Sequence, residues 1–207
     1  MPDRSSALRK GFNIEAVSIV WIMVEAATGI RAGLAAHSLA LTAFGADSVI
    51  EFAAGCALLW RLSLEMNGAG ENRVRRAEKT AAYVVGVSLL LLAVYVLLAA
   101  VYDLVVRRAA GVSPAGIALA LAAFFLMSWL AKAKRKTGRE IGSPALQADG
   151  ACSIVCAYMA LVLLAGVTLT ALLGWWWIDA VASLGLVYFM IREGIEAIEA
   201  ARGEKGT

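Results

Sequence analysis

Four acidic residues interrupt long apolar stretches of the sequence: Glu25, Asp47, Glu51 and Asp149. If these stretches cross a membrane, each ionised carboxylate costs about 3 kcal/mol, and the four together cost on the order of 10 kcal/mol. A chain retains such groups when they are paired, protonated or directed into a polar cavity. The sequence predicts no basic residue deep in any apolar stretch, so a cation from outside the protein is the expected partner.

The spacing of these residues predicts metal ligands. Asp47 and Glu51 are four residues apart, so on a helix they share one face, where their charges repel unless a cation lies between them. A second stripe of oxygen- and sulfur-bearing side chains occupies positions i, i+3, i+4 and i+7: Asp149, Cys152, Ser153 and Cys156. Such donors bind divalent transition metals. We therefore expect a divalent metal ion to bind among these residues.

The elements that position these residues are apolar segments of membrane-spanning length. The 207 residues are 61% hydrophobic and 17% charged, with a mean hydropathy of +0.75, which is too apolar for a soluble domain. Apolar windows of about 20 residues predict six spans: 12–30, 34–60, 80–104, 110–131, 143–171 and 175–197. The predicted fold is an all-α membrane protein with six transmembrane helices. Its predicted parts are an N-terminal segment (1–10), a transmembrane domain (11–197) and a tail (198–207).

The distribution of basic residues predicts the orientation. Of the nineteen Lys and Arg residues, only Arg31, Arg107 and Arg108 fall in the loops of one side. Basic loops stay in the cytoplasm, so both termini are predicted to be cytoplasmic, in a multi-pass protein of the cell (inner) membrane. Orientation and contact with anionic lipid of the bilayer account for the basic runs, and no nucleic-acid partner is predicted.

Counting residues from the basic ends of the spans estimates the depth of each acid. Glu51 and Asp149 both lie ten residues in, and Asp47 and Ser153 both lie fourteen in, on spans that run in opposite directions. The count predicts that Asp149 is level with Glu51 and Ser153 with Asp47. Glu25 reaches about the same height on the first span, where we expect a proton relay or an auxiliary ligand.

The dipeptide Ala-Asp occurs in both of these spans. Ala46-Asp47 and Ala148-Asp149 lie on the second span of each three-span half. With six spans these two helices run in opposite directions, as in a transporter with an inverted repeat and a site at the repeat interface. We therefore include an inverted 3+3 repeat among the predictions.

These residues carry a family resemblance. Ala-Asp-Ser-Val-Ile-Glu (46–51), answered by Ala-Asp-Gly-Ala-Cys-Ser (148–153), resembles the cation diffusion facilitator family over roughly residues 10–197. The resemblance implies export of divalent metal ions, commonly zinc, against protons, through a tetrahedral site of two i, i+4 pairs on the second and fifth spans. Family members usually carry a cytoplasmic ferredoxin-like domain after the sixth span. Only residues 198–207 follow it here, so we expect a membrane-only relative, in which any homodimer would form through the spans.

The resemblance allows two registers on the fifth span. The acids of the second span match the family's paired ligands, with Glu51 in place of the usual Asp. Asp149 then falls where the family often has His or Asp, and Ser153 falls where it has Asp. Shifting the match by three residues instead places Cys152 and Cys156 at the ligand positions. The depth count favours the first register, and both registers lack the family's fourth carboxylate.

The predicted function is efflux of a divalent transition metal, with Zn²⁺ the first choice and Mn²⁺ or Fe²⁺ the others. Three carboxylates would repel one another in the empty site, so we expect the site to hold protons and release them to the metal. No resident cofactor is predicted. The alternative is a non-transporting metal sensor or assembly subunit with the same site. An enzyme is disfavoured, because no nucleophile lies beside a base, and an intramembrane aspartyl hydrolase would need bare carboxylates beside a substrate groove.

Overall fold

All regular elements in the described part of the chain are helices. The computed structural model describes residues 4–35, 39–107, 114–173, 175 and 177–203, and some side chains inside helices, including that of Asp47, lie outside this description. The elements are α1 (Arg4–Ala35), α2 (Leu39–Met66), α3 (Glu71–Val106), α4 (Pro114–Ile141), α5 (Pro144–Leu173) and α6 (Ile178–Arg202). The all-α prediction is confirmed.

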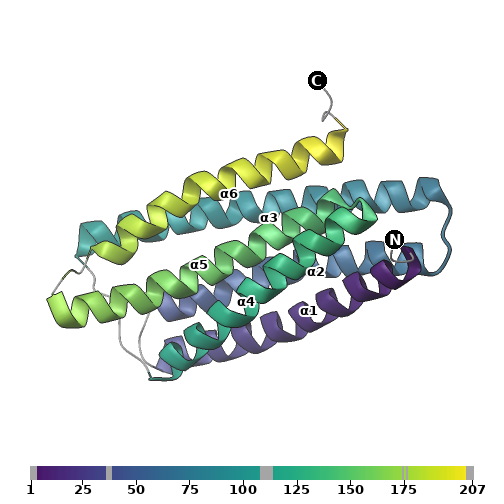
Figure 1. Ribbon diagram of the computed structural model, residues 1–207. Helices are drawn as coiled ribbons and strands as arrows, with labels where there is room; N and C mark the ends of the chain where they lie inside the picture. The colour runs from purple at the N-terminus through teal and green to yellow at the C-terminus, as the bar shows by residue number, and fades with distance from the viewer. Residues whose placement is uncertain (1–3, 36–38, 108–113, 174, 176, 204–207) are drawn as a thin grey trace.

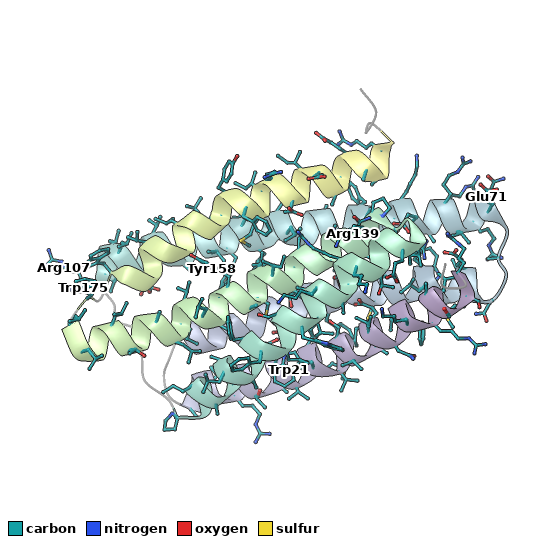
Figure 2. The ribbon with its side chains drawn as sticks, viewed as in Figure 1. Trp21, Glu71, Arg107, Arg139, Tyr158 and Trp175 are labelled. Atoms are coloured by element: carbon teal, nitrogen blue, oxygen red, sulfur yellow. The ribbon has the colours of Figure 1, made fainter. Side chains whose placement is uncertain are left out.

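The six helices run up and down in one elongated bundle (Figure 1). The α2–α3 and α4–α5 turns lie at the same end as the first residue of α1 and the last residue of α6. We call this the basic end; Glu71 and Arg139 mark it in Figure 2. Arg107 and Trp175 mark the opposite end, which we call the tryptophan end. The two described ends of the chain therefore lie at one end of the bundle, while the side of the membrane that this end faces stays a prediction.

Four helices contain a described segment long and apolar enough to cross a membrane: Arg4–Ala32, Glu71–Val106, Ile117–Ile141 and Pro144–Ala165. They coincide with the first, third, fourth and fifth predicted spans. Helices α2 and α6 coincide with the other two, and the count of six spans stays a prediction, as does the inverted repeat. Large apolar side chains, such as those of Val20, Leu98 and Phe125, are exposed on the outside of the bundle. A lipid environment accounts for this exposure.

Small residues allow the helices to pack closely in pairs. The most extensive contacts join α1 to α2, α3 to α6 and α4 to α5. Where α3 crosses α6, a Cβ added at Gly86 would lie 2.8 Å from the carbonyl oxygen of Gly194. A Cβ added at Gly45 of α2 would lie 2.5 Å from the backbone nitrogen of Ile30 in α1. Larger side chains at these positions would separate the helices and move the residues that lie between them.

At the basic end, Glu78 of α3 holds the N-terminus of α5. Its Oε1 accepts a hydrogen bond from the backbone N–H of Ala145 at 2.8 Å, and its two oxygens accept from the Ser143 hydroxyl at 2.9 and 3.0 Å. The same hydroxyl oxygen caps α5 by accepting from the N–H of Leu146 at 3.1 Å. Arg61 of α2, which is buried, pairs with the Glu78 carboxylate. One carboxylate thus joins α2, α3 and α5 and satisfies free N–H groups of a helix N-terminus.

We predict that Glu78→Gln destabilises the protein by about 3 kcal/mol, because it removes the charge that pairs with a buried arginine. Ser143→Ala, which removes the cap alone, should cost about 1 kcal/mol. The measurement is the thermal unfolding midpoint in detergent, with Glu71→Gln at the exposed start of α3 as the control. A midpoint for Glu78→Gln equal to that of the control would contradict the role of Glu78.

Candidate metal centre

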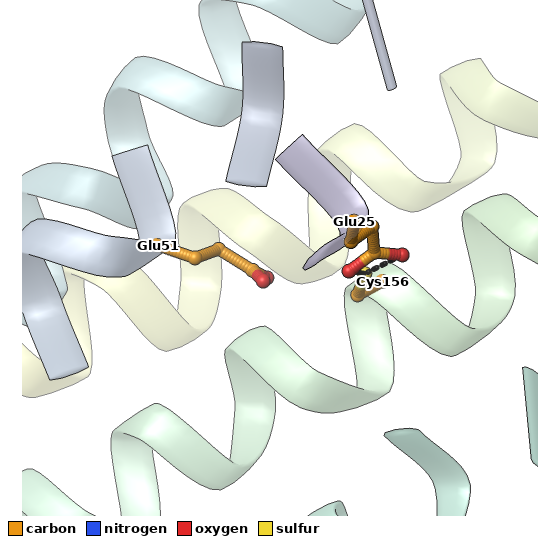
Figure 3. Close-up of side chains that lie close together, drawn as sticks. All are labelled: Glu25, Glu51 and Cys156. Atoms are coloured by element: carbon orange, nitrogen blue, oxygen red, sulfur yellow. Dashed lines mark hydrogen bonds between the residues drawn. The ribbon is translucent and has the colours of Figure 1, made fainter. Parts of the chain in front are cut away.

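Three helices bring Glu25 of α1, Glu51 of α2 and Cys156 of α5 together in the interior of the bundle. One ligand atom from each of these residues lies within 4.8 Å of the other two, and all three side chains are buried. The Cys156 thiol donates to both oxygens of the Glu25 carboxylate at 3.7 Å. Figure 3 shows the Glu51 side chain extending from α2 toward the other two residues. We call this group the central cluster.

Apolar packing and one further hydroxyl position the central cluster. Cys156 belongs to a buried core that contains Ile22, one turn before Glu25 on α1, and Ala160, one turn after Cys156 on α5. The small alanine lets α5 approach its neighbours closely. Ser48 of α2 is buried and hydrogen-bonds the Glu25 carboxylate. The packing of α1, α2 and α5 therefore holds the carboxylates of Glu25 and Glu51 close together.

The central cluster has the donors and the spacing of a metal site. Zn²⁺ binds oxygen and sulfur ligands at about 2.0 to 2.3 Å in a tetrahedral arrangement, which places the ligand atoms roughly 3.5 Å apart. The Cys156–Glu25 separation of 3.7 Å is close to that value, and small side-chain movements would bring Glu51 into range. Two carboxylates and a thiolate would also supply the negative charge that a divalent cation needs.

For Asp47, a predicted ligand, the structure describes the backbone and not the side chain. Its backbone lies in α2, one helical turn before Glu51, so the two residues share a helix face. Its side chain lies outside the described part of the chain. Its assignment as a ligand therefore stays a prediction, in which it would supply a fourth donor beside Glu51.

Asp149 lies in a second buried group rather than beside Glu51. Lys134 of α4 forms an ion pair with Asp149, lies 3.2 Å from Oε2 of Glu15 in α1, and donates to the Ser18 hydroxyl at 2.7 Å. All four side chains are buried, and Lys134 is only 1% exposed. We call these four residues the lysine cluster. The expectation that no basic residue lies deep in the bundle to pair with the acids is wrong for Asp149.

The reason is the length of α4. The predicted span ends at 131, which assigns the following basic run to a loop, but α4 continues to Ile141. Its last turns carry Lys132 and Lys136 on the exposed side and Lys134 on the buried side, facing α1 and α5. The basic run that the orientation prediction used therefore also supplies a positive charge inside the bundle.

The depth count is wrong for Glu51 and Asp149. A carboxylate oxygen of Glu51 lies within 4.8 Å of the Cys156 sulfur, and Asp149 lies seven residues before Cys156 on α5, about 10 Å nearer the basic end. The count used Arg61 as the mark of a helix end, but Arg61 is a buried, paired residue and α2 continues to Met66. The reference point on α2 was therefore inside the bundle.

Cys156, a ligand position of the second register, lies beside Glu51 in the structure. Asp149, a ligand position of the first register, pairs with Lys134. Ser153 is buried and donates to the backbone carbonyl of Asp149 at 3.4 Å. Cys152 is buried one turn from Cys156, in a core shared with α3 and α6. Whether Asp149, Ser153 or Cys152 also contacts a metal ion stays a prediction.

Sequence reasoning missed the lysine cluster, although α1 carried a signal for it. Glu15, Ser18, Ile22 and Glu25 recur at i, i+3, i+7 and i+10, which is the spacing of one helix face. The structure buries all four side chains along that face. A polar stripe of this kind inside an apolar segment predicts a row of buried polar contacts rather than a single site.

The comparison with known families places the chain in one family. Residues 16–202 match the sequence model of the cation efflux transmembrane domain. The match spans most of the chain and includes all three residues of the central cluster. No curated protein matches the sequence at a significant level.

We predict that Cys156 provides the sulfur ligand of the metal centre. Co²⁺ bound through a thiolate has a charge-transfer absorption band that an oxygen-only site lacks, so the purified protein should show this band when it binds Co²⁺. Cys156→Ser should lose the band, while Cys152→Ser and Cys56→Ser should keep it. Loss of the band in Cys152→Ser, with Cys156→Ser unchanged, would instead identify Cys152 as the ligand.

Proposed function

This chain belongs to the cation efflux family, and on that premise we propose that it exports a divalent transition metal ion, with Zn²⁺ as the principal substrate. The observation that carries the proposal is the central cluster of Glu25, Glu51 and Cys156, in which three helices contribute buried metal-ligand side chains. We assign Asp47 to the same site as its fourth ligand, from its position one turn before Glu51.

The location of the central cluster supports transport. Glu51 and Cys156 each lie near the middle of a helix of 28 or 30 residues. Transporters commonly place the substrate site near the bilayer midplane, between helices that can shift against one another. A site shared by α1, α2 and α5 changes its ligand geometry when any of these helices shifts. Metal release can therefore follow from a small helix movement.

The donor set favours zinc. A thiolate prefers softer ions, which lowers the relative affinity for Mg²⁺ and Mn²⁺, whereas carboxylates bind all of these divalent ions. A site with two or three carboxylates and one thiolate therefore selects Zn²⁺, with Fe²⁺ as the closest competitor. Because Cys156 is the soft ligand, we expect α5 to determine selectivity and the acids of α1 and α2 to determine capture.

Proton exchange follows from the same donors. Carboxylates and thiols bind metal in their deprotonated forms, so a metal ion displaces protons. The hydrogen bond from Cys156 to Glu25 holds a proton between two of the proposed ligands. When the metal leaves, protons limit the repulsion between the acids. We therefore propose that the protein is an antiporter of metal and protons in the cell membrane, and that any homodimer forms through its helices.

We predict that Glu51→Gln and Asp47→Ala each reduce Zn²⁺ flux into liposomes roughly tenfold or more, since a loss of 1.4 kcal/mol in ligand binding already corresponds to tenfold. Glu140→Gln, at an exposed position near the end of α4, is the control and should transport like the parent. Parental flux in Glu51→Gln would place the site elsewhere. Zn²⁺ binding by the parent without flux would favour a sensor or assembly subunit.

We predict that Zn²⁺ affinity rises with pH between about 5.5 and 8, because protons compete with the metal for its ligands. Calorimetry in buffers of different ionisation enthalpy would count the protons released per metal. Cys156→Ala should release fewer protons than the parent, and Cys56→Ala should release the same number. An affinity that is constant across this pH range would rule out proton exchange at the site.

A further inference from the structure

The lysine cluster lies outside the proposed metal centre and has the composition of a second cation site. The Lys134 ammonium is surrounded by three oxygen-bearing side chains from two helices: Glu15 and Ser18 of α1, and Asp149 of α5. The ammonium is 3.2 Å from a Glu15 oxygen and 2.7 Å from the Ser18 oxygen. This nitrogen therefore stands where a cation with oxygen ligands would stand.

The cluster contains two carboxyl groups but only one ammonium group. Two carboxylates face one ammonium, and Oε1 of Glu15 accepts no hydrogen bond from any described residue, although the Glu15 side chain is fully buried. A buried, unsatisfied carboxylate oxygen is costly. It points toward α2, where a Cβ added at Gly55 would lie 2.9 Å away. Glycine at this position leaves the oxygen room to reorient toward a cation.

We propose that Glu15, Ser18 and Asp149 form a second cation site, which the Lys134 ammonium fills in this structure and which a divalent cation takes over when that ammonium is withdrawn. Its ligands are all oxygens, which suit Mn²⁺ and Mg²⁺ and include no soft donor. The central cluster, with its thiol, has a different preference. The two sites can therefore be distinguished by the metal used as the probe.

The position of the second site gives it a role in transport, and this part of the inference rests on the proposed function. Asp149 lies two turns from Cys156 along α5, and Gly55 lies one turn from Glu51 along α2, in both cases toward the basic end. A metal ion moving between the basic end and the central cluster would pass the lysine cluster. The Lys134 ammonium blocks this path when it lies between Glu15 and Asp149. When the ammonium moves away, the second site becomes free to bind the metal ion.

The test is Mn²⁺ binding by the full chain in detergent, measured by the electron paramagnetic resonance signal of free Mn²⁺. Lys134→Met should bind one more Mn²⁺ than the parent, and Asp149→Asn added to it should remove that gain. Lys136→Met, an exposed lysine on the same helix, and Lys134→Arg, which keeps the charge, are the controls and should gain none. Equal Mn²⁺ binding by Lys134→Met and the parent would overturn the proposal.

Lys134→Met leaves two buried carboxylates without their cation, so it can fail to fold. In that case Mn²⁺ present during expression and purification should restore a monodisperse protein, and such rescue supports the site. The charge-balanced Asp149→Asn/Lys134→Met variant shows whether methionine itself is tolerated. If that variant folds while Mn²⁺ does not rescue Lys134→Met, the proposal is overturned.

The same comparison in a Glu51→Gln background separates this inference from the proposed function. A gain of one Mn²⁺ there establishes the second site even if the Glu51 variants keep parental transport. Loss of Zn²⁺ flux in Glu51→Gln, with no gain of Mn²⁺ in Lys134→Met, supports the metal centre and rejects the second site.

Discussion

The structure depends on one constraint, which is that a carboxylate inside a lipid-embedded bundle needs a positive partner or a proton. The protein satisfies this constraint differently in its two buried polar clusters. Near the basic end, Lys134 of the chain itself pairs with Asp149 and lies beside Glu15. In the middle of the bundle, Glu25 and Glu51 face each other beside a thiol. That site is the place where we propose that a cation from outside the chain binds.

Helices α1 and α5 connect the two clusters. Glu15 and Glu25 share one face of α1, and Asp149 and Cys156 lie two turns apart on α5. A rotation or shift of either helix would therefore change both clusters together.

The remaining helices serve as a framework for this pair of sites. Helices α3 and α6 pack together through Gly86 and Gly194, and they contribute no described side chain to either cluster. Glu78 of α3 nevertheless fixes the N-terminus of α5, five residues before Asp149 begins the polar stripe. The positions of the ligands on α5 therefore depend on a contact at the basic end of the bundle.

The sequence alone predicted the all-α architecture, the resemblance to the cation efflux family and the position of the acids Glu25, Glu51 and Asp149 inside the helices, where the structure buries all three. Hydropathy and i, i+4 spacing are local properties of the chain, and the resemblance to the family was carried by two short motifs, at 46–51 and 148–153. Only the tertiary structure decided which side chains contact one another. It brings Glu51 close to Glu25 and Cys156, and it pairs Asp149 with Lys134. Partner choice depends on where each helix ends and which face it turns inward. Those features are set by packing between helices through Gly45, Gly55 and neighbouring small residues, so residue counts along single spans could not predict them.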